Sequence, residues 1–194
     1  MKKVSTFVNL DQSYVFHMIN KNYKYYFRII DSYEIKIGKK IELFVSDFRI
    51  QIESEYIFDP LQSTVTFNNE INNKVSNDNR EINTNLKISV VDKRDLLKKI
   101  KRYDISQSKE VIKFGRDSES LDICLNNEDV SNLHFRIIFD KSKSTWIIKD
   151  GNGKKLSSNG TWMLIQEYYE IPKNRNTYFR YENKVFMSYY DNDI

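Results

Sequence analysis

Alanine is absent from this chain of 194 residues, and cysteine, proline and histidine are scarce. The single cysteine, Cys124, excludes a disulfide within the chain and any zinc site that is rich in cysteine. The histidines have no acids or cysteines at ligand spacing, so we expect no metal site and no cofactor. Apolar runs are too short to span a membrane, and no signal-peptide core follows the N-terminus. We therefore expect an intracellular protein, nuclear or cytoplasmic (cytoskeletal assemblies included), with no membrane partner.

Aromatic residues are plentiful, since the chain holds 13 Tyr and 12 Phe among a hydrophobic content of 40%. This composition favours strands over helices and supplies enough apolar area for a core, so we expect an all-β fold. The net charge of +4 is compatible with an anionic ligand but is too small to argue for nucleic acid.

Three short motifs organise the second half of the chain, and each lies next to a segment that the sequence predicts to be a strand. They are Gly115-Arg116, Ser131-Asn132-Leu133-His134 and Ser158-Asn159-Gly160-Thr161. The predicted strands cover 111–114, 121–125, 135–139 and 145–148, and they show the period-2 alternation of half-buried strands. If neighbouring strands run antiparallel, the three motifs meet at one end of the sheet.

The residue types in these motifs predict binding rather than catalysis. Arg116 supplies a guanidinium, Ser131 and Ser158 supply hydroxyls, and Asn132 and Asn159 supply amides. A guanidinium forks onto phosphate oxygens, and an Asn amide can pair with both polar groups of a peptide backbone. There is no nucleophile beside a base and no phosphate-binding glycine loop, so we expect no enzyme.

In their order and spacing, these motifs resemble those of the forkhead-associated (FHA) domain, a β-sandwich that binds phosphothreonine peptides. The resemblance covers roughly residues 86–190. It implies that Arg116 and Ser131 hold the phosphate and that Asn132 adds a phosphate or backbone contact. It further implies that Ser158 lines the threonine pocket and that Asn159 clasps the ligand backbone. Gly115, His134, Gly160 and Thr161 match structural positions of the motif.

Two features depart from the family pattern or add to it. The loop over 150–158 is longer than the connection that is usual in the family. Asp129 precedes Ser131 on the loop that reads the ligand beyond the phosphothreonine. An acid at that place favours a basic or neutral ligand residue over an acidic one.

The first half of the chain predicts more strands without these motifs. Apolar residues alternate around 24–52, and Gly38-Lys39 between Ile35 and Ile41 predicts a hairpin. We interpret residues 1–60 as a β-rich N-terminal region, either an extra sheet or a degenerate FHA-like half, which binds stable protein neighbours or serves a structural role. An Asn-rich linker over 61–85 separates it from the FHA domain at 86–190.

Two further segments flank the motifs within the expected domain. Leu96, Leu97 and Ile100 share one face of a predicted helix over 93–102, opposite lysines and arginines. This basic run predicts either a solvated connector or a contact with nucleic acid, which the absence of interleaved aromatics disfavours. Strands over 178–181 and 185–189 resemble the pair that returns an FHA chain beside its first strand, predicted at 86–91.

The sequence thus leaves two functional interpretations. In the first, the chain is a phosphothreonine-peptide-binding module, and its partner is a protein that carries a phosphothreonine. In the second, it is a non-catalytic structural subunit of a large assembly, which uses the FHA fold without any need for phosphate.

Overall fold

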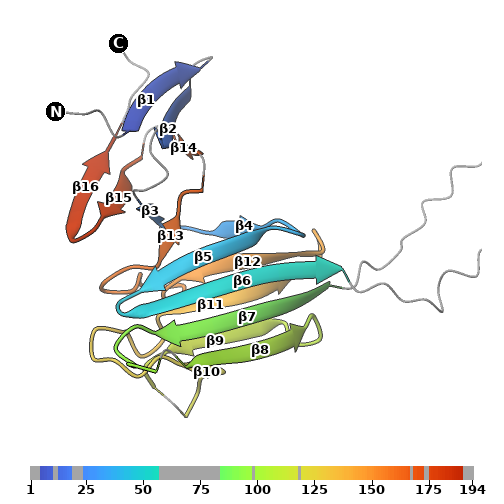
Figure 1. Cartoon of the computed structure of the whole chain (residues 1–194). Coiled ribbons are helices and arrows are strands. Elements are labelled where there is room, and N and C mark those ends of the chain that lie inside the picture. The colour runs from blue at the N-terminus through green and yellow to red at the C-terminus, as the bar shows by residue number, and fades with distance from the viewer. Residues whose placement is uncertain are drawn as a thin grey trace, which may run out of the picture.

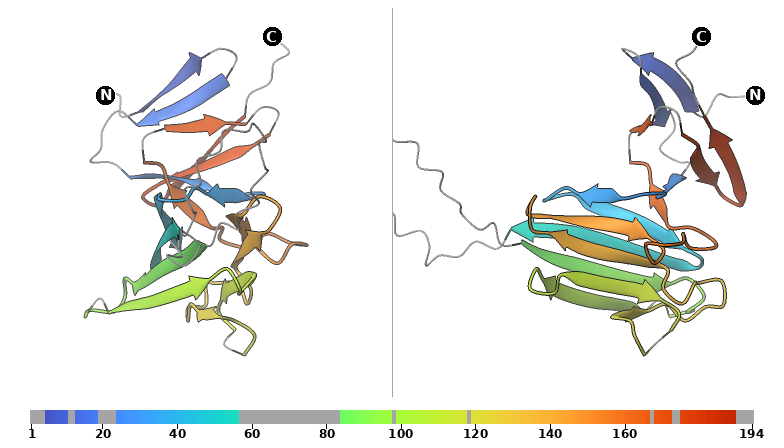
Figure 2. Two further views of the ribbon diagram at one scale, coloured as in Figure 1. Left: turned by 90° about the vertical axis from the view of Figure 1, so that its right-hand side faces the viewer. Right: turned by 180° about the vertical axis from the view of Figure 1, so that it is seen from behind.

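Two sheets stacked face to face form the body of the molecule, which we describe from a computed structural model (Figure 1). The structure describes residues 5–10, 13–18, 24–56, 84–97, 99–117, 119–166, 168–172 and 175–189. All of the helix or strand structure in these residues is strand, so the expectation of an all-β sandwich is confirmed. Figure 2 shows the two layers from the side and from behind.

The smaller layer of the sandwich carries the strands that flank the three motifs. Its order is β10 (Ile123–Cys124), β9 (Val111–Gly115), β11 (Phe135–Asp140), β12 (Thr145–Asp150) and β4 (Tyr33–Ile35). β11 runs antiparallel to β9 and β12, as the sequence predicts, whereas β10 runs parallel to β9. Because β10 runs parallel to β9, both strands finish at the same end of the sheet, and the chain leaves β10 near the point where it leaves β9.

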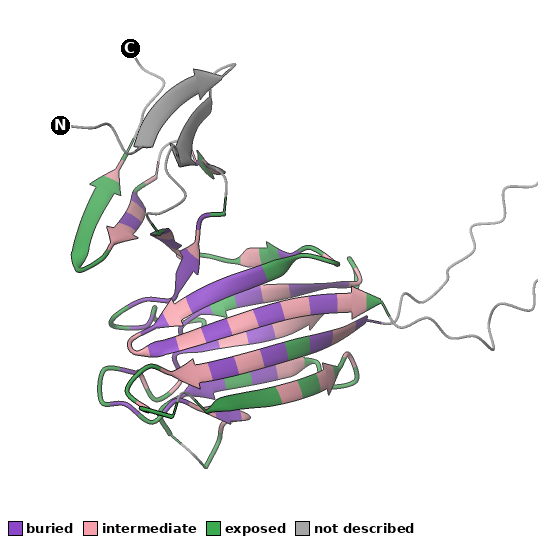
Figure 3. Ribbon diagram, in the orientation of Figure 1, coloured by how far each residue is buried: buried purple, intermediate pink, exposed green. Residues whose placement is uncertain are grey.

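The larger layer joins strands from both halves of the chain. Its order is β16 (Lys184–Ser188), β15 (Thr177–Tyr181), β3 (Tyr25–Arg28), β13 (Trp162–Leu164), β5 (Lys40–Val45), β6 (Phe48–Tyr56), β7 (Thr84–Asp92) and β8 (Ile100–Ser106). Buried and less buried residues alternate along β6 and β7, which Figure 3 shows as stripes. This alternation places one face of the sheet on the core and the other in water.

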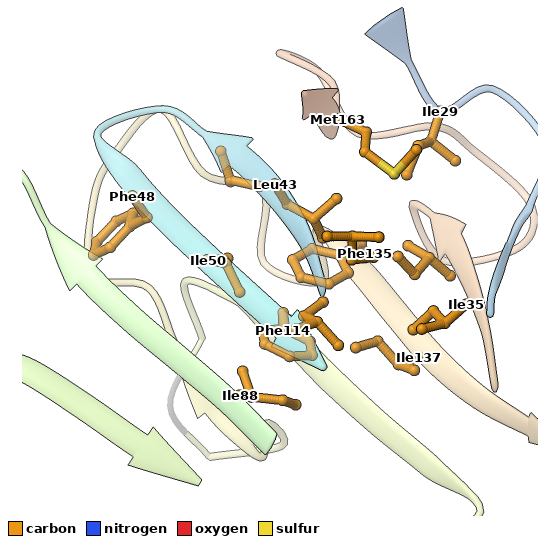
Figure 4. Packing of buried hydrophobic residues seen from close by; sticks show 14 of the residues in the cluster. Ile29, Ile35, Leu43, Phe48, Ile50, Ile88, Phe114, Phe135, Ile137 and Met163 are labelled. Carbon is orange, nitrogen blue, oxygen red and sulfur yellow. The ribbon is translucent and has the colours of Figure 1, made fainter. Parts of the chain in front are cut away.

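The core lies between the two layers, where side chains from both sheets interdigitate (Figure 4). Phe114 and Phe135 stack with ring centroids 4.1 Å apart on the smaller sheet. Trp146, also on that sheet, is fully buried and donates from Nε1 to the Thr84 hydroxyl of β7, 3.0 Å away. Apolar contact and this cross-layer hydrogen bond therefore both hold the two sheets together.

A third, three-stranded sheet comprises β1 (Ser5–Leu10), β2 (Ser13–Met18) and β14 (Tyr168–Ile171). Tyr169 of β14 stacks on Phe27 of β3, with centroids 3.9 Å apart, and meets Phe179 of β15 edge-on. β14 therefore ties this sheet to the end of the larger layer that β3 and β15 form.

The expected division of the chain at residues 60 and 86 does not follow the sheets. β3, β5 and β6 are hydrogen-bonded into one sheet with β7 and β13, and β4 pairs with β12 of the other sheet. Residues 24–56 are therefore part of the sandwich and are neither an extra sheet nor a second FHA-like half. Of the expected linker over 61–85, Thr84 and Asn85 belong to β7, and the rest lies outside the described residues.

The hairpin that we predicted at Gly38-Lys39 is wrong as well. The two flanking strands lie in different sheets, so the turn carries the chain from β4 of the smaller layer to β5 of the larger one. Gly38 adopts a φ of 73° and donates from its amide to the Ser54 carbonyl, 2.8 Å away. A left-handed residue here supports the sharp change of direction.

Two other predictions near the ends of the domain also fail. Residues 93–97 form turns, and residues 100–106 form strand β8, so the helix over 93–102 is wrong. Leu96 and Leu97 are 96% and 75% exposed and anchor nothing. The strand pair β15–β16 is present, but it returns beside β3, because the strand predicted as the first one is β7 and lies between β6 and β8.

Candidate functional site

The three motifs lie on loops that meet at one end of the sandwich, where β9 and β12 end and β11 begins. At Gly115, the last residue of β9, an added Cβ would lie 2.0 Å from the carbonyl oxygen of Asn132. The next residue, Arg116, donates from its amide to the Ser131 carbonyl at 3.0 Å. Glycine thus allows the first two loops to touch backbone to backbone, which explains why this motif begins with Gly-Arg.

The Arg116 side chain is exposed, and uncharged acceptors hold it in place. Its Nη1 donates to the Glu128 carbonyl and its Nη2 to the Asn132 Oδ1, both at 3.1 Å. Among the described residues, it makes no ion pair with a carboxylate, so its positive charge is not neutralised within the protein. A guanidinium has five N–H donors, and those not used in these two bonds are available to a ligand.

The Ser131 hydroxyl lies where the second loop meets the third. Its Oγ accepts a hydrogen bond from the Ser158 amide at 3.3 Å, which leaves the hydroxyl proton free for another acceptor. Arg116 and Asn132 share the hydrogen bond described above, so the five expected ligand-binding residues fall on contacting loops. Ser131 is half-buried, and Arg116, Asn132, Ser158 and Asn159 are exposed.

His134 connects the second and third loops from the interior of the protein, and its side chain has no exposed surface. Its Nδ1 accepts from the Ser131 amide at 3.1 Å, and its Nε2 lies 3.2 Å from the Gly160 carbonyl. Since Nδ1 accepts, Nε2 carries the proton of the neutral ring and donates to that carbonyl. Burial lowers the pKa of His134 below its usual 6.5, which keeps the ring neutral.

Asn159 ties the third loop to the second and to the larger sheet. Its Nδ2 donates to the Asp129 carbonyl at 2.8 Å, and its own carbonyl accepts from the Trp162 indole at 2.8 Å. The amide oxygen Oδ1 and the second N–H of Asn159 are then left for a ligand. Asp129 itself is exposed, so its carboxylate faces water beside this loop.

The long loop before Asn159 is closed at its base by Asp150, a residue that we did not predict to have a role. The Asp150 carboxylate is 4% exposed and accepts from the hydroxyls of Ser157 and Thr161 at 2.7 and 2.5 Å, and from the Ser157 amide at 3.0 Å. Residues 151–156 therefore form a loop whose two ends are held together, and the chain returns at Ser157, directly before the third motif. Three donors on one buried carboxylate give this loop a rigid base.

Arg28 of β3 is a second residue that sequence reasoning missed. Its Nη2 donates to the Ser157 carbonyl at 2.7 Å, and a Cβ added to Gly160 would lie 2.7 Å from its Nε. Gly160 also has a φ of 78°, so both its conformation and its surroundings require glycine. No local pattern marks Arg28, because its partners lie more than a hundred residues further along the chain.

The described residues contain no group of His, Cys, Asp or Glu arranged to hold a metal ion. They also contain no helix with the length and hydropathy of a membrane span. What the site offers is a fixed positive charge, hydroxyl and amide donors, and amide oxygens. These groups can bind an anion and a peptide backbone together.

Comparison with known families agrees with this geometry. Residues 112–175 match the model of the FHA domain family, a range that holds all three loops. Searches of curated proteins and of solved structures found no match. FHA domains are generally non-catalytic interaction modules whose general role is phosphopeptide binding. With the sandwich and its three loops, this match shows that residues 112–175 are similar to an FHA domain.

Proposed function

We propose that this FHA-like domain binds a phosphothreonine-containing segment of a protein partner at the three loops. The observation that carries the proposal is the exposed Arg116 guanidinium, held by two uncharged acceptors beside the Ser131 hydroxyl. A phosphothreonine brings a charge of about −1.5 to −2 and three strong acceptor oxygens. An unneutralised guanidinium with donors to spare complements such a group.

Each loop residue has a role in this proposal. Arg116 and Ser131 donate to the phosphate, and Asn132 orients the guanidinium through its Oδ1. Asn159 uses its remaining N–H and its Oδ1 to clasp the peptide backbone, while Ser158 lines the side of the threonine pocket. The exposed Asp129 carboxylate selects a basic or neutral ligand residue beyond the phosphothreonine.

The energetic expectation follows from the hydrogen bonds to the phosphate. A hydrogen bond that involves a charged group contributes roughly 1.5–3 kcal/mol. The variant Arg116→Ala should therefore bind a phosphothreonine peptide about tenfold to a hundredfold more weakly, since about 1.4 kcal/mol is a factor of ten.

Fluorescence anisotropy with a phosphothreonine peptide library tests this proposal. Arg102→Ala, which removes an exposed arginine from β8, is the matched control and should bind like the parent protein. The unphosphorylated peptides should bind far more weakly than the phosphorylated ones. Equal binding by Arg116→Ala and the parent would rule out the site.

A second candidate function is that of a structural subunit in a stable assembly, and one observation favours it. Within the described residues, β16 is an edge strand of the larger sheet; Val185 and Met187 on it are both 56% exposed, and Tyr189, just after it, is 51% exposed. An apolar edge strand invites pairing with another chain. Purification of the native protein separates the two functions, because partners that survive phosphatase treatment in fixed stoichiometry favour the structural role.

A further inference from the structure

A second group of cations lies outside the three loops, on the solvent-facing side of the larger sheet. Lys24, Lys93 and Arg180 line a pocket of about 450 Å³ together with Tyr26 and Phe44. Tyr26 alternates with the buried Tyr25 and Phe27 on β3, so its side chain points away from the core. This pocket uses none of the five residues of the candidate phosphopeptide site.

Two of the three cations of the pocket lie over aromatic rings. The Lys93 Nζ lies 3.8 Å from the ring centroid of Phe44, and the Arg180 guanidinium lies 5.9 Å from the same ring and 6.0 Å from that of Trp162. Ring faces attract cations but do not neutralise them. Within the described part of the chain, neither Lys93 nor Arg180 makes an ion pair with a carboxylate.

The carboxylates near the pocket compensate these charges only in part. Glu42 is 7% exposed and accepts from Arg49 at 2.5 Å, while Lys24 stands 3.9 Å away at its other oxygen. Partial desolvation lowers the pKa of Lys93, the charges of Lys24, Arg49 and Arg180 lower it further, and the opposing effect of Glu42 does not reverse this direction. Positive charges therefore crowd this pocket, and an anion that entered it would relieve their repulsion.

The neighbouring surface limits the length of that anion. Glu182 lines the pocket itself, and the next hollow along the same sheet holds the acids Glu53 and Asp104 together with the cations Lys40, Lys87 and Arg102. A long polyanion such as a nucleic acid strand would pass over these acids, whereas one short acidic group would not. The charge pattern thus fits a carboxylate or phosphate on a peptide side chain.

The pocket also lies at the same end of the sandwich as the three loops. Lys93 donates from its amide to the Asp47 carbonyl, and the Asp47 carboxylate accepts from Asn127, which lies on the loop that leads to Ser131. On the other side, the Trp162 indole connects the pocket to Asn159. A protein that binds at the loops can therefore also reach the pocket.

We propose that the pocket formed by Lys24, Lys93 and Arg180 is a second anion-binding site, which takes an acidic or phosphorylated side chain of a protein partner. It acts independently of Arg116, because the two sites share no side chain. The shared chemistry of its ligands is an anionic oxygen group that is small enough to avoid Glu182.

Nuclear magnetic resonance titration of the ¹⁵N-labelled full chain with a short glutamate homopeptide tests the proposal. The backbone signals of Phe44, Lys93 and Arg180 should shift, and Arg116→Ala should bind the homopeptide as tightly as the parent. Lys93→Met and Arg180→Met should each weaken binding by about tenfold, the value of one charge-assisted hydrogen bond. Lys36→Met and Arg102→Met, which remove exposed cations elsewhere, should leave binding unchanged.

Further measurements distinguish the possible ligands, and a third variant keeps the test valid if one of the others fails to fold. Lys24→Met gives a third variant, because Lys24 rests on no ring of the pocket and its removal should leave the fold intact. Pyrophosphate that competes with the homopeptide shows that the pocket accepts phosphate as well, and without competition the ligand is a carboxylate. Equal binding by Lys24→Met, Lys93→Met and the parent overturns the proposal, as does tighter binding of oligothymidylate than of the homopeptide.

Discussion

The molecule presents positive charge in two ways at the same end of its sandwich. At the loops, the Arg116 guanidinium is fixed by two carbonyl-type oxygens, each 3.1 Å from a nitrogen. In the pocket, Lys93 and Arg180 lie over ring faces, which attract charge without directing an N–H, although the Arg180 Nε also donates to the Glu182 carbonyl at 2.9 Å. From this comparison we expect the loops to select a ligand mainly by geometry and the pocket to select one mainly by charge.

Gly115→Ala should have the largest effect, because it should disturb the loops and leave the pocket unchanged. A Cβ at this position meets backbone atoms of Ser131 and Asn132 that no side-chain rotation can move. We expect a loss of about 1–3 kcal/mol in the free energy of unfolding, as for other overpacked sites. We also expect a larger loss of phosphothreonine-peptide binding than Arg116→Ala causes, because Ser131 and Asn132 must move together.

Denaturant unfolding and fluorescence anisotropy measure the two effects of Gly115→Ala. Binding of the glutamate homopeptide in the pocket should persist in this variant, because the pocket shares no residue with the displaced loop. Gly38→Ala is a control for backbone strain alone: Gly38 has a φ of 73°, which strains an alanine, but nothing stands within 4 Å of its added Cβ, so peptide binding should not change. Loss of homopeptide binding in Gly115→Ala would mean that the two sites are one.

Exchanging arginine and lysine at the two sites tests the same comparison and should have a smaller effect on ligand affinity. Lysine is a point charge and cannot reproduce the two fixed bonds of Arg116, so Arg116→Lys should lose about tenfold in phosphothreonine-peptide affinity. Lys93→Arg should keep its homopeptide affinity, because a ring face accepts either cation. Anisotropy measurements on both variants decide the matter, and equal tolerance at the two positions would contradict the distinction.

A change of pH should give the smallest effect, and only at the loops. The pKa of His134 is lowered by burial, so the unfolded chain binds this proton more readily than the folded one. The contribution of neutral His134 to stability is present above pH 6.5 and is lost as the pH falls through its folded pKa. Protonated Nδ1 can no longer accept from the Ser131 amide, so peptide binding should weaken over the same window.

Unfolding free energies of the parent and of His134→Gln at pH 7.5 and below pH 6 test this expectation. The variant should be less stable than the parent near neutral pH, and the difference between them should shrink as the pH falls. The homopeptide affinity of the pocket does not depend on His134 and serves as the internal reference. A difference that grows on acidification would contradict the assigned tautomer.

The local parts of the site could be predicted from the sequence. The Gly-Arg pair ends β9 and the Ser-x-x-His motif directly precedes β11, so their meeting follows from the antiparallel pairing of these strands. Eight residues separate β12 from the Asn-Gly pair, and the contacts of Asp150 with Ser157 and Thr161 bring this pair back to the other two motifs. The roles of Asp150 and Arg28 could not be predicted. A single acid and a single arginine carry no pattern, and Arg28 contacts the site only through the pairing of β3 with β13.

The larger errors concern pairing over long sequence distances. The alternation of apolar residues over 24–52 predicted the strands correctly, but it does not show which strands they pair with. We therefore assigned these strands to a separate region, although they complete the two sheets of the sandwich. The helix predicted over 93–102 rested on three leucine and isoleucine positions. The edge of β7 instead pairs with residues 100–106, which satisfies the backbone hydrogen bonds of both segments.

The pairing of β6 with β7 has a practical consequence. The two strands match residue for residue, from Phe48 with Asp92 near the loops to Tyr56 with Thr84 at the opposite end. The 27 intervening positions, 57–83, therefore connect two chain ends that already lie side by side, and closing a longer connection costs only slightly more entropy than closing a short one. A fluorescent reporter or an affinity tag inserted between Tyr56 and Thr84 would be attached at the end of the sandwich opposite the two proposed anion sites.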